Sequence, residues 1–265
     1  MIHHRIDAAQ QNAVSHSKSP EGQEATPSEH EPREAFPYQP PNEPLQKQYR
    51  HVFGQTQALK VPWPKLLFDK LLAVFFLLLS APIIVLLLLA NAIEGMLIAE
   101  NKGPLFFYYY AVSRGKVFKK WKIRIIKESY IDKELQKQGD WHAFQNEWDP
   151  KARTITGRFV KKFYLDEIPQ FFLILKGDMS FVGPRPLAVH HYQRDLQQGN
   201  VTRKLVRGGL LGYGHIRKGT PDFGKAHFEY EYVHRYLQSS SFGLLLTDLY
   251  VIRRGIAVVL KGGGH

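Results

Sequence analysis

The chain has 265 residues, a formal net charge of +12 and no cysteine. This length allows one sizeable core with appendages. The lack of cysteine excludes a disulfide framework and a thiolate zinc site. Residues 1–60 hold six Lys/Arg against seven Asp/Glu, so the basic excess lies entirely after residue 60. Such an excess indicates an anionic partner: phospholipid headgroups, nucleic acid or a phosphorylated substrate.

Residues 1–60 have the composition of a polar tail. They are rich in Gln, Ser, His and Glu, they show no periodic aliphatic residues, and prolines stand at positions 20, 27, 32, 37, 40, 41 and 44. Such a segment cannot bury enough apolar surface to offset the entropy of ordering it. We therefore expect residues 1–60 to be disordered or loosely packed.

An apolar run from Leu66 to Ile93 follows the tail. Its charge-free part, from Leu71 onward, is long enough to cross a bilayer as a single-pass helix. Two features favour a helix that enters and leaves by the same face. Ser80 and Pro82 lie near the centre, and a proline there removes a backbone hydrogen bond and kinks the helix. Both flanks are basic, and basic flanks belong on the cytoplasmic side. The residues alone leave the two topologies open.

The apolar run points to a membrane rather than nucleic acid as the anionic partner. No helix-turn-helix, ribonucleoprotein or zinc-finger spacing supports nucleic-acid binding. In residues 103–127, the alternation of VFKKWKIRII predicts a strand or an amphipathic segment at the membrane surface. Lys122 and Arg124 are candidate substrate-facing cations in this stretch, although headgroup binding would by itself explain its basic residues.

Residues 157–186, GRFVKKFYLDEIPQFFLILKGDMSFVGPRP, hold the candidate chemistry. Asp is a favoured helix N-cap, Pro169 suits a first turn and Gly177 suits a helix end, so we expect a short buried helix with Asp166 and Glu167 at its N-terminus. That end favours carboxylates and can hold a phosphate. Arg158 and Arg185 stand nearby in the sequence. A capping role without chemistry is the plain alternative for the two carboxylates.

The segment resembles the bacterial sugar transferases, the monotopic polyprenyl-phosphate phosphoglycosyl transferases. It matches their GRF segment, their Leu-Asp-Glu-hydrophobic-Pro-Gln segment and their Lys-Gly-Asp-Met-Ser-hydrophobic-Val-Gly-Pro-Arg-Pro segment. The resemblance covers roughly residues 62–263. It departs at Tyr108-Tyr109, where an Arg-Gln pair is common, and in residues 207–219, where the Pro, Thr and Gln of a Pro-Gly-Ile-Thr-Gly stretch and the residues after it are replaced.

The resemblance implies a mostly helical α/β fold, associated with the membrane as a monotopic unit. It implies a re-entrant helix–break–helix at residues 61–95, broken at Ser80 and Pro82, and a catalytic domain at residues 96–265 on the cytoplasmic face of a bacterial inner membrane. At the C-terminus, apolar residues recur at helical spacing from Phe242 to Leu260, with Asp248, Arg253 and Arg254 on the other side. This pattern predicts an amphipathic, surface-lying or core-packed helix.

The implied reaction moves a sugar-1-phosphate from a UDP-sugar to a polyprenyl (undecaprenyl) phosphate and releases UMP, which begins the assembly of a surface polysaccharide or glycoconjugate. Asp166 and Glu167 would be catalytic and would hold Mg²⁺, with Asp166 forming a covalent phosphosugar intermediate. Arg158, Arg185, Lys122 and Arg124 would bind substrate phosphates. Two alternatives are a catalytically silent membrane scaffold of the same fold and a basic peripheral membrane protein.

Overall fold

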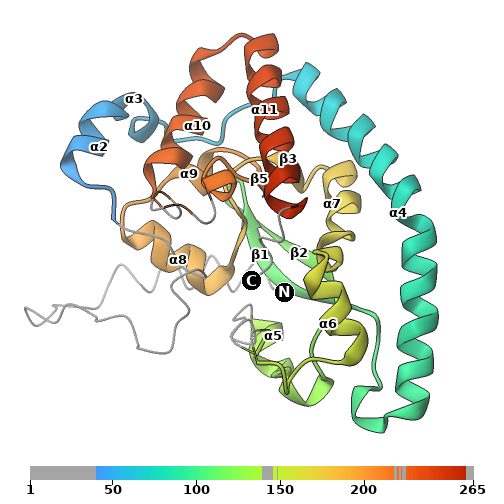
Figure 1. Ribbon diagram of the computed structural model, residues 1–265. Helices are drawn as coiled ribbons and strands as arrows, with labels where there is room; N and C mark the ends of the chain where they lie inside the picture. The colour runs from blue at the N-terminus through green and yellow to red at the C-terminus, as the bar shows by residue number, and fades with distance from the viewer. Residues whose placement is uncertain are drawn as a thin grey trace, which may run out of the picture. The chain divides into compact units, whose positions relative to one another are not determined.

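In the computed structural model, Pro32–His265 form one compact unit. The structure describes residues 40–138, 146, 147, 149–217, 220, 222 and 225–260. All of these belong to this unit, and their ribbon is coloured in Figure 1. The unit is mostly helical with two small sheets, as the resemblance implies.

The first sheet is built on a hairpin of β1 (Phe106–Ser113) and β2 (Lys116–Ile123), which run antiparallel. Arg114 and Gly115 both have positive φ, of 53° and 71°, and make the two-residue turn whose twist matches the strands. β4 (Leu187–Ala188) pairs with the other edge of β1. β3 (Met179–Val182) and β5 (Gly208–Leu211) form a separate parallel pair. The predicted strand in VFKKWKIRII is confirmed as β2.

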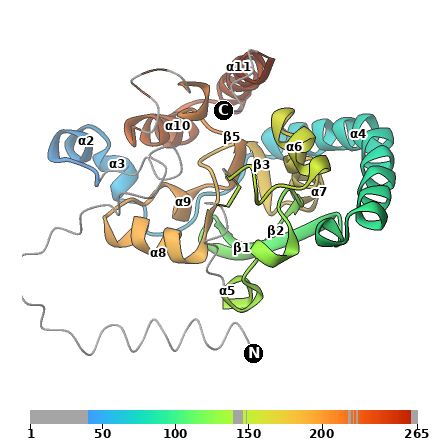
Figure 2. The same ribbon diagram turned by 60° about the horizontal axis from the view of Figure 1, so that its bottom comes forward.

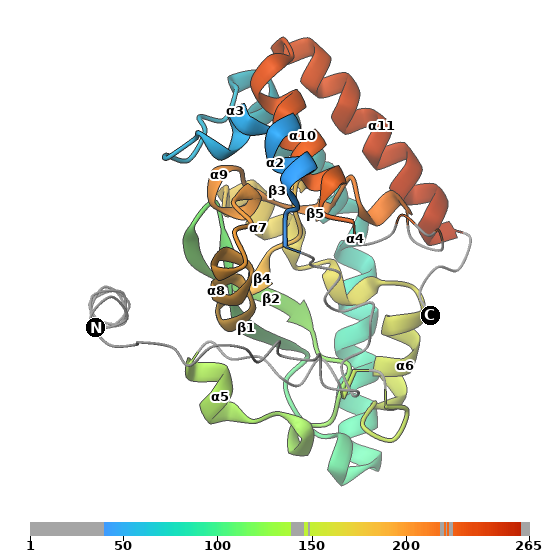
Figure 3. The same ribbon diagram turned by 90° about the vertical axis from the view of Figure 1, so that its left-hand side faces the viewer.

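Helices surround the two sheets (Figures 1 and 3). α8 (Val189–Gln197) packs beside β1, and α7 (Gln170–Lys176) leads through the left-handed Gly177 into β3. α10 (His227–Gln238) and α11 (Ser241–Leu260) follow β5. The remaining short helices are α5 (Lys133–Gln138), α6 (Ile155–Lys162), α9 (Thr202–Leu205) and the 3-10 turns η1 (Ala99–Asn101), η2 (Glu128–Tyr130), η3 (Leu165–Glu167) and η4 (His215–Arg217).

The apolar run forms α4 (Trp63–Leu97), which among the described residues is the one helix long and apolar enough to cross a membrane. Its helical assignment is continuous through Pro82, and the ribbon bends along its length (Figure 2). The hydroxyl of Ser80 donates to the Leu77 carbonyl at 3.2 Å. The helix therefore bends but remains one continuous helix through Ser80 and Pro82, where the sequence predicts a break.

Both ends of α4 are tied to the rest of the unit. Near its start, the Asp69 carboxylate accepts hydrogen bonds from the Ser180 hydroxyl at 2.7 Å and the Phe181 N–H at 3.2 Å. Near its end, the Glu94 carboxylate accepts from the N–H of Ile155 at 2.6 Å and of Thr156 at 2.8 Å. One face of α4 packs on α7, where Phe76 stacks on Phe171 with ring centroids 5.2 Å apart.

Residues 40–60 are packed, in contrast to the loosely packed tail that the sequence predicts for this stretch. α2 (Glu43–Gln48) and α3 (Arg50–Phe53) bury Leu45, Tyr49 and Val52 against the unit. The Phe53 ring stacks on Tyr230 of α10, with centroids 4.7 Å apart. Leu45, Tyr49 and Val52 recur at helical spacing, so one face of this short polar segment packs against the unit. Residues 1–39 lie outside the described residues.

α11 confirms the predicted C-terminal helix but reverses the position of one charge. Asp248 is fully buried, although the periodicity places it on the polar side. Its carboxylate accepts from the Lys65 ammonium at 2.6 Å and the Tyr232 hydroxyl at 3.0 Å. Apolar side chains face outward instead, including Phe242, Leu246 and Ile256. A buried partner on α4 explains the reversal, because a paired charge can be buried where an isolated one cannot.

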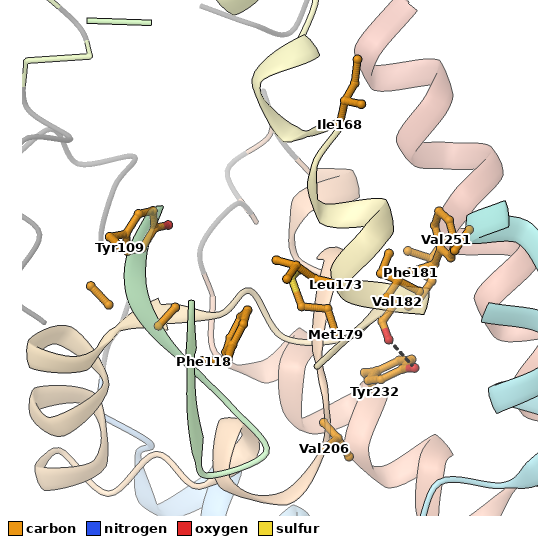
Figure 4. Packing of buried hydrophobic residues seen from close by; sticks show 14 of the residues in the cluster. Tyr109, Phe118, Ile168, Leu173, Met179, Phe181, Val182, Val206, Tyr232 and Val251 are labelled. Carbon is orange, nitrogen blue, oxygen red and sulfur yellow. Dashed lines mark hydrogen bonds between the residues drawn. The ribbon is translucent and has the colours of Figure 1, made fainter. Parts of the chain in front are cut away.

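The core lies between the strands and the helices that cover them. Leu173 of α7 meets Met179 of β3, and Phe181 and Val182 of β3 lie beside Val251 of α11 (Figure 4). The Tyr232 hydroxyl closes this layer, because its single hydrogen lies between two acceptors, the Val182 carbonyl and the Asp248 carboxylate, each 3.0 Å from its oxygen. This packing fixes β3 and therefore the Gly183–Pro186 loop that follows it.

Candidate active site

The inner face of β2 carries two buried lysines. Lys120 is 0% exposed and Lys122 is 4% exposed, whereas Lys119, the residue before Lys120, lies on the opposite face of the strand and is exposed. Lys120 lies opposite Tyr109 in the β1–β2 register, with its ammonium 5.8 Å from the Tyr109 ring centroid. The strand thus presents two cations to one side of the sheet.

α6 is fixed at its start by caps from two directions. The Thr154 hydroxyl accepts from the Gly157 N–H at 2.8 Å, and Glu94 of α4 takes the N–H groups of Ile155 and Thr156. Gly157 is required because a Cβ there would lie 2.1 Å from the Ile125 carbonyl oxygen. The glycine of the GRF motif therefore allows α6 to lie directly on the strand end after β2.

Asp166 and Glu167 lie in the 3-10 turn η3, which follows Tyr164 in a left-handed conformation (φ 54°). The expectation that Asp166 caps the following helix is wrong. α7 begins at Gln170, its N-cap residue is Pro169, and no side chain caps it. The Asp166 carboxylate is bound instead by an ammonium from β2, which is a stronger partner than an N–H group.

That partner is Lys122, whose ammonium lies 2.7 Å from Oδ2 of Asp166. The same ammonium lies 3.5 Å from Oε1 of Glu147, and Glu147 also pairs with Lys161 of α6 at 2.8 Å. Asp166 is 2% exposed and Glu147 is 6% exposed. Asp166, Lys122, Glu147 and Lys161 thus form a largely buried series of ion pairs in which the sign of the charge alternates.

Glu167 pairs with Arg185, with Nη2 and Oε1 2.6 Å apart. Arg185 stands in the Gly183-Pro-Arg-Pro loop after β3, and its carbonyl accepts from the Arg203 guanidinium at 2.9 Å. Gly183 lets this loop lie on the chain before β5, because a Cβ there would come within 2.3 Å of the Arg207 carbonyl oxygen. The loop is therefore anchored on both sides of the arginine.

The charges of the cluster reinforce one another. Burial alone would raise the pKa of Glu147, but the ammonium groups of Lys122 and Lys161 lower that pKa to about 2. Burial would likewise raise the pKa of Glu167, and Arg185 and Lys120 hold it well below its usual range. The pKa of Lys122 is raised, because Asp166 and Glu147 outweigh its desolvation. The carboxylates Glu147 and Glu167 are therefore ionised at neutral pH.

Lys120 behaves differently. Burial, followed by repulsion from Arg185, lowers its pKa well below the ordinary value, and the attraction of Glu167 does not compensate. Its ammonium has no hydrogen-bond partner among the described residues. His215 of η4 faces the same group of charges, and burial followed by Arg185 lowers its pKa to about 3, so its imidazole is neutral.

The other predicted site residues lie apart from this cluster. Arg158 is exposed on α6 and donates to the Pro150 carbonyl at 3.2 Å. Arg124 is 1% exposed and donates to the carbonyls of Pro104, Ile126 and Asn101 and to the Asn91 side chain. This position favours a structural role for Arg124, which ties the end of β2 to α4. The assignment of Arg158 and Arg124 to phosphate binding stays a prediction.

Sequence reasoning missed Glu147, Lys120 and Tyr109. The period-2 alternation from Lys122 could have placed Lys120 on the same face. Glu147 lies in a polar stretch with no motif and carried no such signal. Among the described residues no three His, Cys, Asp or Glu side chains form a ready metal site. Asp166 and Glu167 nonetheless offer the carboxylate oxygens that Mg²⁺ prefers, and their ion pairs use only Oδ2 and Oε1.

Comparison with known sequences decides the family. The profile described as "Bacterial sugar transferase" matches residues 61–262. The chain belongs to the bacterial sugar transferase family. The match includes α4, the ion-pair cluster and all of α11, so the site described above lies wholly inside the matched region.

Several curated proteins are similar in sequence to this chain. The UDP-glucose:undecaprenyl-phosphate glucose-1-phosphate transferase of Escherichia coli (strain K12) is 35% identical over 176 residues, which are 62% of this chain and 35% of that protein. The UDP-N-acetylgalactosamine-undecaprenyl-phosphate N-acetylgalactosaminephosphotransferase of Aeromonas hydrophila is 29% identical over 70% of this chain and 42% of that protein. The exopolysaccharide production protein ExoY of Sinorhizobium fredii (strain NBRC 101917 / NGR234) is 27% identical over 75% of this chain and 86% of that protein. The match thus spans less than half the length of the first two relatives and most of the third.

Proposed function

We propose that this protein transfers a sugar-1-phosphate from a UDP-sugar to undecaprenyl phosphate and releases UMP. The observation that carries the proposal is the buried Asp166, paired with Lys122 and next in sequence to the Glu167–Arg185 pair, in a chain whose relatives carry names for this reaction. The product would begin a surface polysaccharide or glycoconjugate, and the name of the Sinorhizobium relative agrees with this.

The reaction would have two steps. A carboxylate oxygen of Asp166 attacks the phosphorus that carries the sugar, the bond from that phosphorus to the bridging oxygen breaks, and UMP leaves with the electron pair. A phosphate oxygen of the polyprenyl acceptor then attacks the same phosphorus. The acyl-phosphate bond breaks, the Asp166 carboxylate is restored, and the product is a polyprenyl diphosphate-linked sugar.

Three side chains would support these steps. Lys122 orients the Asp166 carboxylate in the resting site, and its ammonium would stabilise the oxygens that gain charge at phosphorus. Arg185 is positioned to bind phosphate oxygens through a planar guanidinium, with Glu167 fixing its orientation. Mg²⁺ held by Asp166 and Glu167 would supply positive charge that offsets the diphosphate of the donor.

The membrane would supply the lipid acceptor, and the attachment of α4 supports a re-entrant seating at the cytoplasmic face of the inner membrane. Asp69 and Glu94 bind the same unit from opposite ends of the helix. A straight span would carry these ends to opposite faces of the bilayer, because its apolar core is about 30 Å thick. Outward apolar side chains on α4 and α11, such as Leu78 and Phe242, would lie in the lipid.

A UMP-release assay with undecaprenyl phosphate and a panel of UDP-sugars tests the proposal. We expect release with at least one sugar, ping-pong kinetics, and a phosphosugar adduct on Asp166 when the acceptor is left out. Asp166→Asn should reduce turnover to background. Intersecting initial-rate plots without an adduct would replace the two steps by direct transfer. No release with any sugar would favour a silent membrane scaffold.

A further inference from the structure

Lys120 is a buried cation that the proposed chemistry leaves without a role. Its side chain is 0% exposed, and its ammonium has no hydrogen-bond partner in the part of the chain that the structure describes. A buried ammonium without partners is costly, because it loses hydration and gains nothing in return. The Tyr109 ring, 5.8 Å away at the centroid, lies near the outer limit for a cation–π contact and accepts no conventional hydrogen bond.

The neighbours of Lys120 place it at the candidate site. It stands two residues from Lys122 on the same face of β2, about 7 Å along the strand. The charged groups that act on it are Arg185 of the Gly183–Pro186 loop, Asp166 and Glu167 of η3, and Lys122. Lys122 and Arg185 already hold carboxylates, at 2.7 and 2.6 Å, and Lys120 does not.

We infer that Lys120 is a substrate-binding residue whose ammonium takes a phosphate oxygen when substrate enters the site. The inference rests on the proposed function and adds a third cation to its phosphate-binding groups. A phosphate has the charge and the acceptor oxygens that the orphaned ammonium lacks. The burial of Lys120 does not exclude contact with substrate, because Asp166 is only 2% exposed itself. A substrate that reacts with the Asp166 carboxylate must open the same cluster of side chains and would thereby reach Lys120.

The phosphate could belong to the nucleotide donor or to the polyprenyl acceptor. Both present phosphate oxygens, so the test has one arm for each. UDP and inorganic pyrophosphate probe the donor side without turnover. Undecaprenyl phosphate in nanodiscs probes the acceptor side.

Lys120→Met in the full-length protein removes the charge and keeps the length of the side chain. Lys119→Met is the matched control, because Lys119 is exposed on the opposite face of the same strand, where its ammonium lies over the Tyr108 ring and away from the cluster. Isothermal titration should show UDP and pyrophosphate binding weakened about tenfold or more in Lys120→Met and unchanged in Lys119→Met. The thermal midpoint without ligand should stay equal or rise in Lys120→Met, since a buried polar group without a partner is lost.

A structural role alone would lower the thermal midpoint and leave affinity intact, which would overturn the inference. If only undecaprenyl phosphate binds more weakly, the inference holds and the phosphate is that of the acceptor. Equal affinities of wild type and Lys120→Met for all three probes overturn the inference without touching the proposed function. A wild-type protein that binds none of the probes overturns both. Lys120→Gln, also neutral, serves as the second variant if Lys120→Met does not fold.

Discussion

The ammonium of Lys122 and the carboxylate of Asp166 lie 2.7 Å apart, with both side chains at most 5% exposed. Removing one member of a buried ion pair leaves the other charged and desolvated, at a cost of about 3–5 kcal/mol. We expect Lys122→Met to lower the unfolding free energy by about that amount. Turnover should fall at least about a hundredfold, as when a single charge-stabilising donor is lost.

A double variant separates the two effects of Lys122. Asp166→Asn added to Lys122→Met removes the stranded charge, so stability should recover in part while turnover stays at background. Lys119→Met, on the outer face of β2, should match the wild type in both measurements. A Lys122→Met protein with wild-type turnover would show that Lys122 has no role in the reaction.

Glu147 joins Lys122 to Lys161, and its stabilising effect should depend on pH. Its pKa is lowered from 4.5 to about 2, so the folded state favours the ionised form by on the order of 3 kcal/mol. This stability is fully present above pH 4.5, the unfolded value, and is lost as pH falls through about 2. We expect Glu147→Gln to be less stable than wild type at pH 7, by a margin that shrinks between pH 4.5 and pH 2.

Denaturant unfolding at several pH values measures this margin. Glu100→Gln is the control, because Glu100 pairs with Lys127 at 3.0 Å but is 66% exposed, and such pairs contribute little. A Glu147→Gln margin that is constant from pH 7 to pH 2 would contradict the ionic origin of the effect.

The sequence was sufficient to predict local features of this fold but not the partners of its buried charges. β2, α11 and the Gly177 helix end follow from patterns within a few residues, and the mostly helical α/β class follows from the family resemblance. Asp248 was placed on the polar side because periodicity treats a charge as solvated. Its partner Lys65 is 183 residues away in the sequence. The role of Glu147 could not be predicted for the same reason, since only the fold brings it to Lys122.

The attachment of both ends of α4 to one unit predicts a one-sided topology. Single cysteines at Gln57 and Lys116, in a chain otherwise free of cysteine, should react only from the cytoplasmic side. Both positions are exposed. Lys116 is a better labelling site than Ser113, its partner across the hairpin, because the buried Ser113 hydroxyl donates to the Asp178 carbonyl at 2.6 Å and accepts from the Gly208 N–H at 2.9 Å. Periplasmic labelling at either cysteine would establish a span instead.

The packed segment at residues 40–60 divides the N-terminal region into parts with different expected effects on stability. Deletion of residues 1–39 should leave the thermal midpoint unchanged, since their composition offers little apolar surface to bury. The specific activity should stay within a few-fold of that of the full chain. Deletion of residues 1–60 should lower the midpoint, because it removes the buried Leu45, Tyr49 and Val52. Each such side chain contributes roughly 1.5–3 kcal/mol when fully buried.

The longer deletion also uncovers α10. It removes the Phe53 ring from Tyr230 and the His51 imidazole from His234, whose ring nitrogens lie 2.8 Å apart. Leu45→Ala in the full chain should reproduce part of the loss, whereas Gln57→Ala, at an exposed position, should not. Equal thermal midpoints for the two deletions would mean that residues 40–60 add no stability to the catalytic unit. A loss of activity on removing residues 1–39 alone would show that the polar tail also contributes to the catalytic unit.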